Sequence, residues 1–514
     1  MARRIFPINN ATGVAAAALV LAVCLGTLAA VAMRADGVSA LTRYDWRAIH
    51  FTLVQAALSG FLSVLFAIPV ARALARRRFF GRGVLVTLLG APFILPVIVA
   101  ILGLTAVFGR NGWVSGMLIW AGFEPLSIYG FHGVILAHVF FNLPLATRLL
   151  LQGWANVPAE NFRLAASLRF RSRDVFRHIE WPMLRAVVPG AFAVIFLICT
   201  TSFAVALTFG GGPNATTVEL AIYEAFRYDF DLGRAALLSV VQFLICGTAV
   251  IVSLRITLPP VGQDRQDRIV RRFDAAGAGA RALDGFWIVL AALFLIAPLT
   301  ALFAKGMGAV PSLPASVWLA AGRSVLTAFG SATIAIVLAV TLALAAQRHR
   351  AFEGIGTLSI AASPLVIGTG LFLILFPVVN ISNVALPVTA LVNAIMALPF
   401  CLRALVPAIR TAEADFGRLA DGLNMHGWAR LRFFVLPRIR GPLGFSAGLS
   451  AALSMGDLGV ITLFAPPDGA TLPLQIYRLM GSYRMEQASG AALLLLALAL
   501  VIFYIFDRWG RSNA

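Results

Sequence analysis

Charge is scarce in this chain. Only 12% of its 514 residues are Asp, Glu, Lys or Arg, against roughly 25% in a soluble domain, while 60% are hydrophobic. This composition predicts an all-α integral membrane protein, because an open strand leaves its backbone groups unpaired in lipid. The net charge of +19 would also suit nucleic-acid binding. The arginines, however, stand in short clusters between apolar runs, where they indicate topology.

Lysine is almost absent, and cysteine is rare. The single lysine, Lys305, precedes Gly306, so the phosphate-binding loop that ends in Lys-Ser/Thr is missing. Any ATP must therefore be hydrolysed by another chain. The four cysteines stand in apolar stretches without metal-ligand spacing, which predicts buried thiols and no metal site. No cluster of His, Asp, Glu or Cys has catalytic spacing, so we expect no enzyme and no cofactor of its own.

Long apolar stretches predict about 12 transmembrane helices, since about 20 residues cross the hydrocarbon core. They lie near residues 12–33, 50–71, 83–108, 131–152, 188–209, 233–254, 285–304, 323–346, 356–378, 386–406, 441–464 and 488–506. Ala30-Val31-Ala32 resembles a signal-cleavage site, but the first apolar run exceeds a signal core, which favours an uncleaved helix. Pro96 and Pro364 predict kinks in the third and ninth spans. Most Lys and Arg residues fall on one side of these spans, which predicts cytoplasmic termini.

One Arg-rich segment occurs twice. Residues 144–185 align without a gap with residues 399–440, and the match extends to spans on either side. We therefore predict two parallel six-helix repeats related by an axis along the membrane normal. The first half covers residues 1–255, a cytoplasmic linker covers 256–284, and the second half covers 285–514.

The repeated segment predicts a helix-turn-helix on the cytoplasmic face. Pro158 near a first turn and Thr411 as a cap would begin the helix of each copy. Leucines four residues apart then share one face, Leu164 with Leu168 and Leu419 with Leu423. The simpler alternative is a loop that only satisfies the positive-inside rule. The helical spacing of the apolar residues favours a docking surface.

These residues resemble the EAA loop of ABC importer permeases, in which Glu-Ala-Ala is followed at fixed distances by a Gly and by Ile-x-Leu-Pro. The matching positions are Arg163, Leu164, Ala165, Leu168, Arg169 and Pro182 in the first copy and Arg418, Leu419, Ala420, Leu423, Asn424 and Pro437 in the second. Arg replaces both Glu residues, and Arg169 and Asn424 replace both glycines. Asn tolerates the left-handed backbone of such a turn better than Arg, which predicts a different shape for the first turn.

Fused two-half permeases for thiamine and thiamine pyrophosphate are the members that the chain resembles most. The residues that carry this likeness are Gly210–Tyr223, Glu180-Trp181-Pro182 and Gly456–Val460. The resemblance implies the type I importer fold in a bacterial inner membrane. It also implies two cytoplasmic ATPase subunits that hold ATP and Mg²⁺, and a periplasmic solute-binding protein. Fused iron(III) permeases share this architecture and remain an alternative.

Polar residues inside the predicted spans are candidates for lining the pathway, because they are costly in lipid. They are His138, Asn142, Ser202, Asn393 and Asp457. Bonds to neighbouring helices are the alternative, which we favour for His138, Asn142 and Ser202. A rival from another class, a secondary transporter driven by an ion gradient, would explain two parallel halves. It would need more ionisable groups within spans and gives no reason for the repeated loop.

Overall fold

The computed structural model describes residues 10–35, 41–90, 94–210, 212, 215–255, 272–360 and 362–511; residues 256–271 of the predicted linker lie outside this set. The first half comprises α1 (Asn10–Ala35), α2 (Arg43–Arg76), α3 (Arg82–Leu88), α4 (Val97–Phe108), α5 (Trp113–Trp120), α6 (Phe131–Asn156), α7 (Ala159–Ser167), α8 (Ser172–Val175), η2 (Phe176–Glu180), α9 (Trp181–Thr200), α10 (Phe203–Phe209), α11 (Val218–Arg227) and α12 (Leu232–Arg255). The described residues form no strand, and the all-α prediction is confirmed.

The second half repeats this order without an α5. It comprises η4 (Phe273–Ala275), α13 (Ala278–Gly306), η5 (Met307–Ser312), α14 (Ala315–Ala345), α15 (Ala351–Thr357), η6 (Leu358–Ile360), α16 (Pro364–Leu375), α17 (Ile381–Gly422), α18 (Gly427–Ala429), η7 (Arg430–Val435), α19 (Leu436–Arg438), α20 (Arg440–Met455), α21 (Gly459–Phe464), α22 (Leu472–Gly481) and α23 (Met485–Arg511). Residues 278–284 of the predicted linker are thus the first turns of α13.

Ten helices of the described part are long and apolar enough to span a membrane, rather than twelve, which makes the chain a multi-pass membrane protein. The ninth and eleventh predicted spans fall short because both are broken into shorter helices. Pro364 begins α16 beside the capping side chain of Ser363, and Gly456 ends α20. The predicted kinks are therefore wrong, because Pro364 and Pro96 stand at helix starts.

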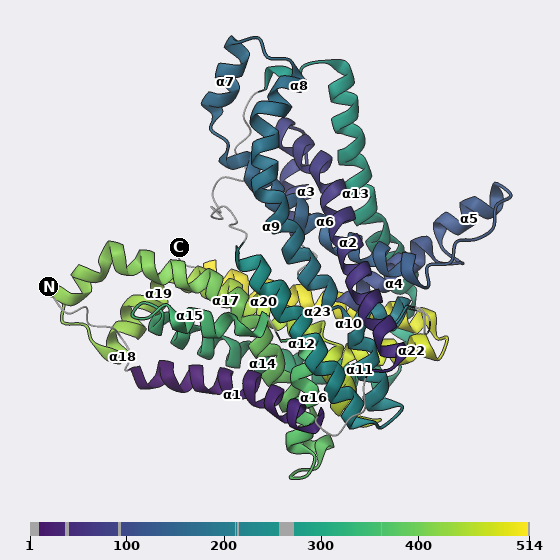
Figure 1. The fold of residues 1–514 in the computed structure, drawn as a ribbon, viewed down its shortest axis with the longest axis vertical. Coiled ribbons are helices and arrows are strands. Elements are labelled where there is room, and N and C mark those ends of the chain that lie inside the picture. Colours follow the sequence, from purple (N-terminus) through teal and green to yellow (C-terminus); the bar gives the residue numbers. More distant parts are fainter. Residues whose placement is uncertain are drawn as a thin grey trace.

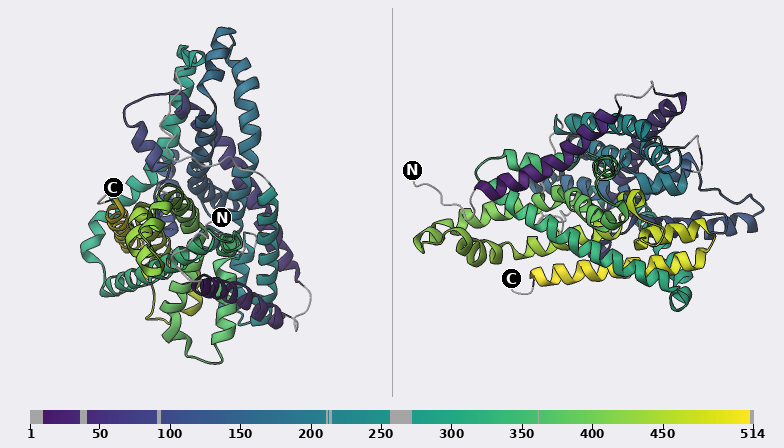
Figure 2. Two further views of the ribbon diagram at one scale, coloured as in Figure 1. Left: turned by 90° about the vertical axis from the view of Figure 1, so that its left-hand side faces the viewer. Right: turned by 90° about the horizontal axis from the view of Figure 1, so that it is seen from below.

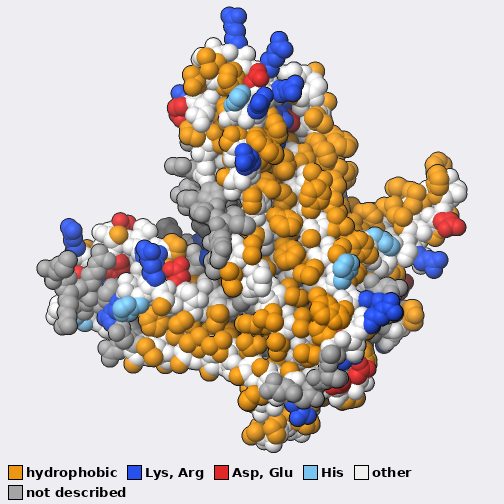
Figure 3. All heavy atoms as spheres, viewed as in Figure 1, with side chains coloured by type: hydrophobic (Ala, Val, Ile, Leu, Met, Phe, Trp, Pro, Cys, Tyr) orange, Lys and Arg blue, Asp and Glu red, His pale blue; other side chains and the backbone are white. Residues whose placement is uncertain are grey.

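The helices form two diverging arms (Figure 1). α2, α6, α9 and α13 build the first arm, and α1, α14, α17 and α20 belong to the second. α10, α11 and α22 lie where the arms meet, while α7 and α18 lie at opposite far ends (Figure 1). Hydrophobic side chains cover the flanks of both arms, and Lys and Arg gather near the tip of the first (Figure 3).

The two halves exchange their first helices. α1 packs against α14 and α16 of the second half, and α13 packs against α2 and α4 of the first. Figure 2 shows α1, in purple, along the green helices of the second half. The exchange continues in the core: Val20 of α1 shares a cluster with residues of the second half and of α10–α12, and Leu295 of α13 shares one with first-half residues.

Glycines permit both of these exchanged contacts. A Cβ at Gly103 of α4 would lie 2.7 Å from the Pro298 carbonyl oxygen of α13. A Cβ at Gly370 of α16 would lie 2.6 Å from the Thr27 carbonyl oxygen of α1. Small residues let helix backbones approach closely in lipid, so each exchanged helix is seated on a backbone where a larger residue would clash.

Candidate functional site

The first repeated loop begins at a break in the helix. Pro158 caps α7 with an extended backbone, one position earlier than predicted. Proline lacks an N–H and pushes the residue before it out of the helical region, so α6 ends at Asn156. After α7 the chain turns at Arg169 and continues through α8 and the π-helical η2 into α9.

The second loop begins without a break in the helix that leads into it. α17 runs for 42 residues from the apolar core into the loop, and Thr411 lies inside it, so the predicted cap at Thr411 is wrong. The physical reason is that Glu413 aligns with Pro158, so nothing breaks the backbone there.

The turns themselves are the same in both loops. Arg169 has φ +53° and Asn424 has φ +54°. The amide of Phe170 donates to the carbonyl of Ala165 at 2.9 Å, and the amide of Met425 donates to that of Ala420 at 3.0 Å. This is the left-handed helix end that usually takes glycine. The predicted difference in shape is therefore wrong, because the cap hydrogen bonds hold Arg169 in the same conformation as Asn424.

Each loop presents two exposed leucines. Leu164 and Leu168 are 61% and 59% exposed, and Leu419 and Leu423 are 61% and 63% exposed. The flanking residues Arg163 and Arg418 and the exit residues Pro182 and Pro437 are exposed as well. Ala165 and Ala420, in contrast, are buried under their helices. The structure thus gives the two loops equal apolar faces.

Beneath the two helices the chemistry differs. In the first loop Phe162 packs with Val175 in a small apolar cluster. In the second, Gly417 and Arg430 stand at the aligned positions, and Arg430 donates to Glu413 at 2.6 Å and pairs with Asp421. Burial would lower the pKa of Arg430, but hydrogen bonds to Glu413 and Asp421 outweigh it and raise that pKa. The sequence analysis did not predict that an ion-pair cluster replaces the apolar packing. The available signal was that Phe162 and Val175 align with the unlike residues Gly417 and Arg430.

Two candidate pathway residues bond within the first arm. His138 of α6 is buried, and its Nδ1 lies 3.3 Å from Ser59 Oγ of α2. Asn142, one turn later, donates to the His138 carbonyl at 2.8 Å and to Cys199 Sγ of α9 at 3.3 Å. Both side chains therefore join neighbouring helices.

The other three candidates gather at two equivalent breaks. Ser202 stands between α9 and α10, and Asp457 stands between α20 and α21. Asn393 of α17 donates to Ser454 Oγ at 3.1 Å, and Asp457 accepts from the Gly459 amide at 3.1 Å. A Cβ on Gly456 would lie 3.2 Å from Cα of Pro96, so this break faces the first half.

Among the described residues, no three His, Cys, Asp or Glu side chains are grouped as metal ligands, and the cysteines are free and buried.

Two sets of membrane helices, with one matched helical loop in each set, fit a transport permease with both halves in one chain. No family model matches the sequence. The chain is 38% identical to the thiamine transport system permease protein ThiP of Escherichia coli, over 98% of this chain and 96% of the relative. ThiP of Brucella abortus is 38% identical over 95% and 93%, and ThiP of Haemophilus influenzae is 31% identical over 90% and 89%. The chain belongs to the ThiP family of transport permeases.

Proposed function

We propose that this chain forms the translocation pathway of an ATP-driven importer for thiamine and thiamine pyrophosphate in the bacterial inner membrane. The relatives match nearly the whole chain and are named as thiamine transport permeases, which supports this substrate class. Both termini lie in the cytoplasm in this proposal, and a periplasmic solute-binding protein delivers the solute.

Two separate ATPase subunits drive the cycle, one on each repeated loop, and they hold the ATP and Mg²⁺. The observation that carries this proposal is the equal exposure of Leu164, Leu168, Leu419 and Leu423 on loops of the same turn geometry. Fully burying an exposed leucine is worth about 1.5–3 kcal/mol, and each of these leucines, about three-fifths exposed, would gain part of that on docking. Four of them give two apolar anchors, and ATP-driven closure of the ATPases would draw the arms together as units.

We propose that Asp457 is the residue that lies nearest the solute. It stands at a helix break that faces the first half, and its carboxylate would favour the cationic thiazolium ring. Replacing Asp457 by Asn should raise the KM for uptake about 10-fold without altering basal ATP hydrolysis. An unchanged KM would remove Asp457 from the pathway.

The coupling proposal is tested with the full chain, a candidate ATPase and the binding protein in lipid vesicles. Leu168→Asp with Leu423→Asp should abolish copurification of the ATPase and solute-stimulated hydrolysis. Ala166→Asp is the matched control: Ala166 is exposed, and the second loop already carries Asp421 at the aligned position. Normal hydrolysis in the double leucine variant would contradict docking at these loops.

Substrate is tested separately with the binding protein. Thiamine and thiamine pyrophosphate should each stimulate hydrolysis, and iron(III) should not. Stimulation by iron(III) alone would replace the substrate assignment and leave the coupling assignment standing. Uptake that persists without ATPase under a proton gradient would favour a secondary transporter.

A further inference from the structure

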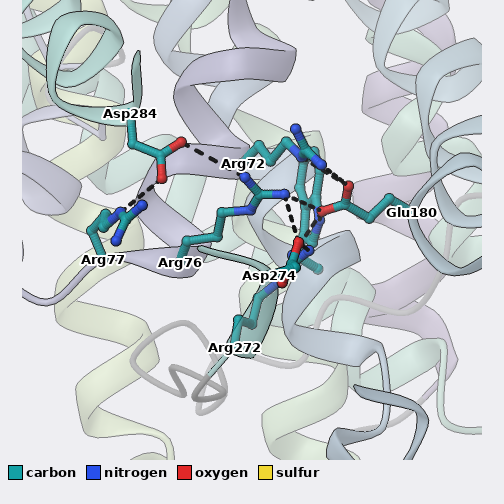
Figure 4. A network of polar contacts seen from close by, with 8 residues as sticks. Arg72, Arg76, Arg77, Glu180, Arg272, Asp274 and Asp284 are labelled. Carbon is teal, nitrogen blue, oxygen red and sulfur yellow. Dashed lines mark hydrogen bonds and ion pairs between the residues drawn. The ribbon is translucent and has the colours of Figure 1, made fainter. Parts of the chain in front are cut away.

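Seven charged side chains from separate segments meet beside the first loop (Figure 4). α2 supplies three arginines, η2 supplies one acid, the described end of the linker supplies one of each sign, and α13 supplies one acid. They are Arg72, Arg76, Arg77, Glu180, Arg272, Asp274 and Asp284. We name this set the linker cluster.

Glu180 is its centre. Its side chain is fully buried, and one oxygen accepts from Arg72 Nε at 2.8 Å. The other accepts from Arg272 at 2.7 Å and from the indole of Trp154 at 3.2 Å. Both oxygens are therefore used by donors from α2, α6 and the linker, and Glu180 directly precedes α9.

Arg272 extends these contacts to α7. Its guanidinium donates to both oxygens of Asp274 and lies 4.7 Å from the ring centroid of Phe162. Burial would lower the pKa of Arg272, but Asp274 and Glu180 raise it above its usual value. Arg272 thus contacts both Phe162, on the buried side of the leucine-bearing helix α7, and Glu180, the residue before α9.

The second half contacts the linker cluster through Asp284 of α13. Asp284 accepts from Arg77 of α2 at 2.7 Å, so the start of α13 is tied to the end of α2. The described linker residues therefore lie between two anchors, one on the first loop and one on α2.

Within the described part of the chain, the second loop lacks this arrangement. Val435, at the position aligned with Glu180, is buried, and the buried arginine Arg430 pairs with Glu413 and Asp421 of the adjoining α17. The second loop is thus tied to its own helix, and the first is tied to the linker and to the other half.

We propose that Arg272 and Asp274 are positioning residues for coupling: the linker holds α7, η2 and α2 together so that they move as one body when the first ATPase moves. This inference rests on the proposed docking of an ATPase at α7. Replacing Arg272 removes its hydrogen bonds to Glu180 and Asp274 and its contact with Phe162, so it should loosen the first loop and leave the second unaffected.

The test compares wild type, Arg272→Met and Arg272→Lys as full chains in lipid with ATPase and binding protein. Hydrogen exchange of residues 159–180 should accelerate about 10-fold in R272M, while residues 412–435 stay unchanged as an internal reference. R272M should still bind the ATPase through its leucines and lose most solute-stimulated hydrolysis, with partial recovery in R272K. Arg430→Met should show the reverse pattern of exchange.

Equal acceleration in both loops, or normal coupling in R272M, would overturn the inference. Should R272M fail to reach the membrane, Asp274→Asn provides the same comparison with Glu180 and Arg272 intact. Failure of wild type to bind the ATPase would overturn the proposed function instead, and the exchange measurement would still decide whether Arg272 holds the first loop.

Discussion

Arg169 and Asn424 share one backbone conformation at the ends of two helices that the chain enters in different ways. Their φ angles differ by 1°, and the same pair of cap hydrogen bonds closes each turn. A left-handed conformation costs an ordinary L-residue about 1–2 kcal/mol, and Asn less. The free-energy cost of this shared conformation therefore arises mainly at Arg169.

Replacing Arg169 by Gly should stabilise the chain by up to about 1 kcal/mol, because relief of the strain exceeds the added chain entropy. Asn424→Gly should give little or no gain. The measurement is thermal unfolding in detergent. Ser167→Gly, at the last residue of α7, is the control and should cost about 0.5 kcal/mol or less. A loss of stability in R169G would show that the Arg169 side chain contributes more than its backbone costs.

The distance between the two loops should shorten when ATP binds. Spin labels at Ser167→Cys and Gly422→Cys occupy aligned, exposed positions, and a Cβ at Gly422 meets no atom within 4 Å. The native cysteines are buried, so labelling should be selective. Pulsed electron resonance with a hydrolysis-deficient ATPase should show the shorter distance with ATP and the longer one with ADP. The same distance in both states would rule out closure of the arms.

The packing beneath the second loop can be exchanged for that of the first. Gly417→Phe alone should destabilise the chain, because a Cβ there would lie 2.9 Å from Glu413 Oε2. Arg430→Val alone removes the partner of Glu413 and Asp421 and should cost about 1–3 kcal/mol. The double variant should cost at least 1 kcal/mol less than the sum, as contacting sites couple by roughly 0.5–3 kcal/mol.

The reciprocal pair in the first loop, Phe162→Gly with Val175→Arg, should not recover. The position aligned with Glu413 is Pro158, which offers the new arginine no acid. Recovery in both loops would mean that volume alone governs the packing.

Glu219 should make stability depend on pH. It lies in α11, outside the candidate spans, and its amide partner is Gln242 at 3.2 Å. Burial raises its pKa from 4.5 to about 7, against hydrogen bonds from Ser363 and Gln242. The folded chain thus holds this proton more tightly than the unfolded chain. The contribution of protonated Glu219 to stability is therefore full below pH 4.5 and is lost as the pH rises to about 7.

Glu219→Gln should remove that dependence, since the new amide stays neutral and can donate to the unpaired Gln242 Oε1. Its gain in melting temperature over wild type should grow between pH about 5 and about 7 and then level off. Glu486→Gln changes an exposed acid and should leave the profile unchanged. Parallel profiles for wild type and E219Q would show that Glu219 is charged throughout.

Periodicity and spacing predicted the helical membrane fold, the two loops and their leucines, because hydropathy and local helix geometry are written along the chain. They failed at one helix start and one turn, where other local features decide. Thr411 has the side chain of a cap, yet α17 continues through it because no proline follows. Arg169 is unfavourable in a left-handed turn, yet the cap hydrogen bonds hold it there.

The linker cluster was beyond prediction for a different reason, because it depends on tertiary contacts. Glu180 and Arg272 are far apart in the sequence, and only the exchanged position of α13 brings the linker beside the first loop. The pathway role of Asn393 and Asp457 stays a prediction.

The exchange of α1 and α13 also bears on how the protein is made. α1 is synthesised first and packs on α12 of its own half, but the residues on α14 and α16 that complete its burial follow later in the chain. The part of α1 that packs on α14 and α16 therefore stays uncovered until those helices are inserted, and neither half can reach its final form before the other is inserted. The contacts of the first helix are therefore complete only when the second half is in place.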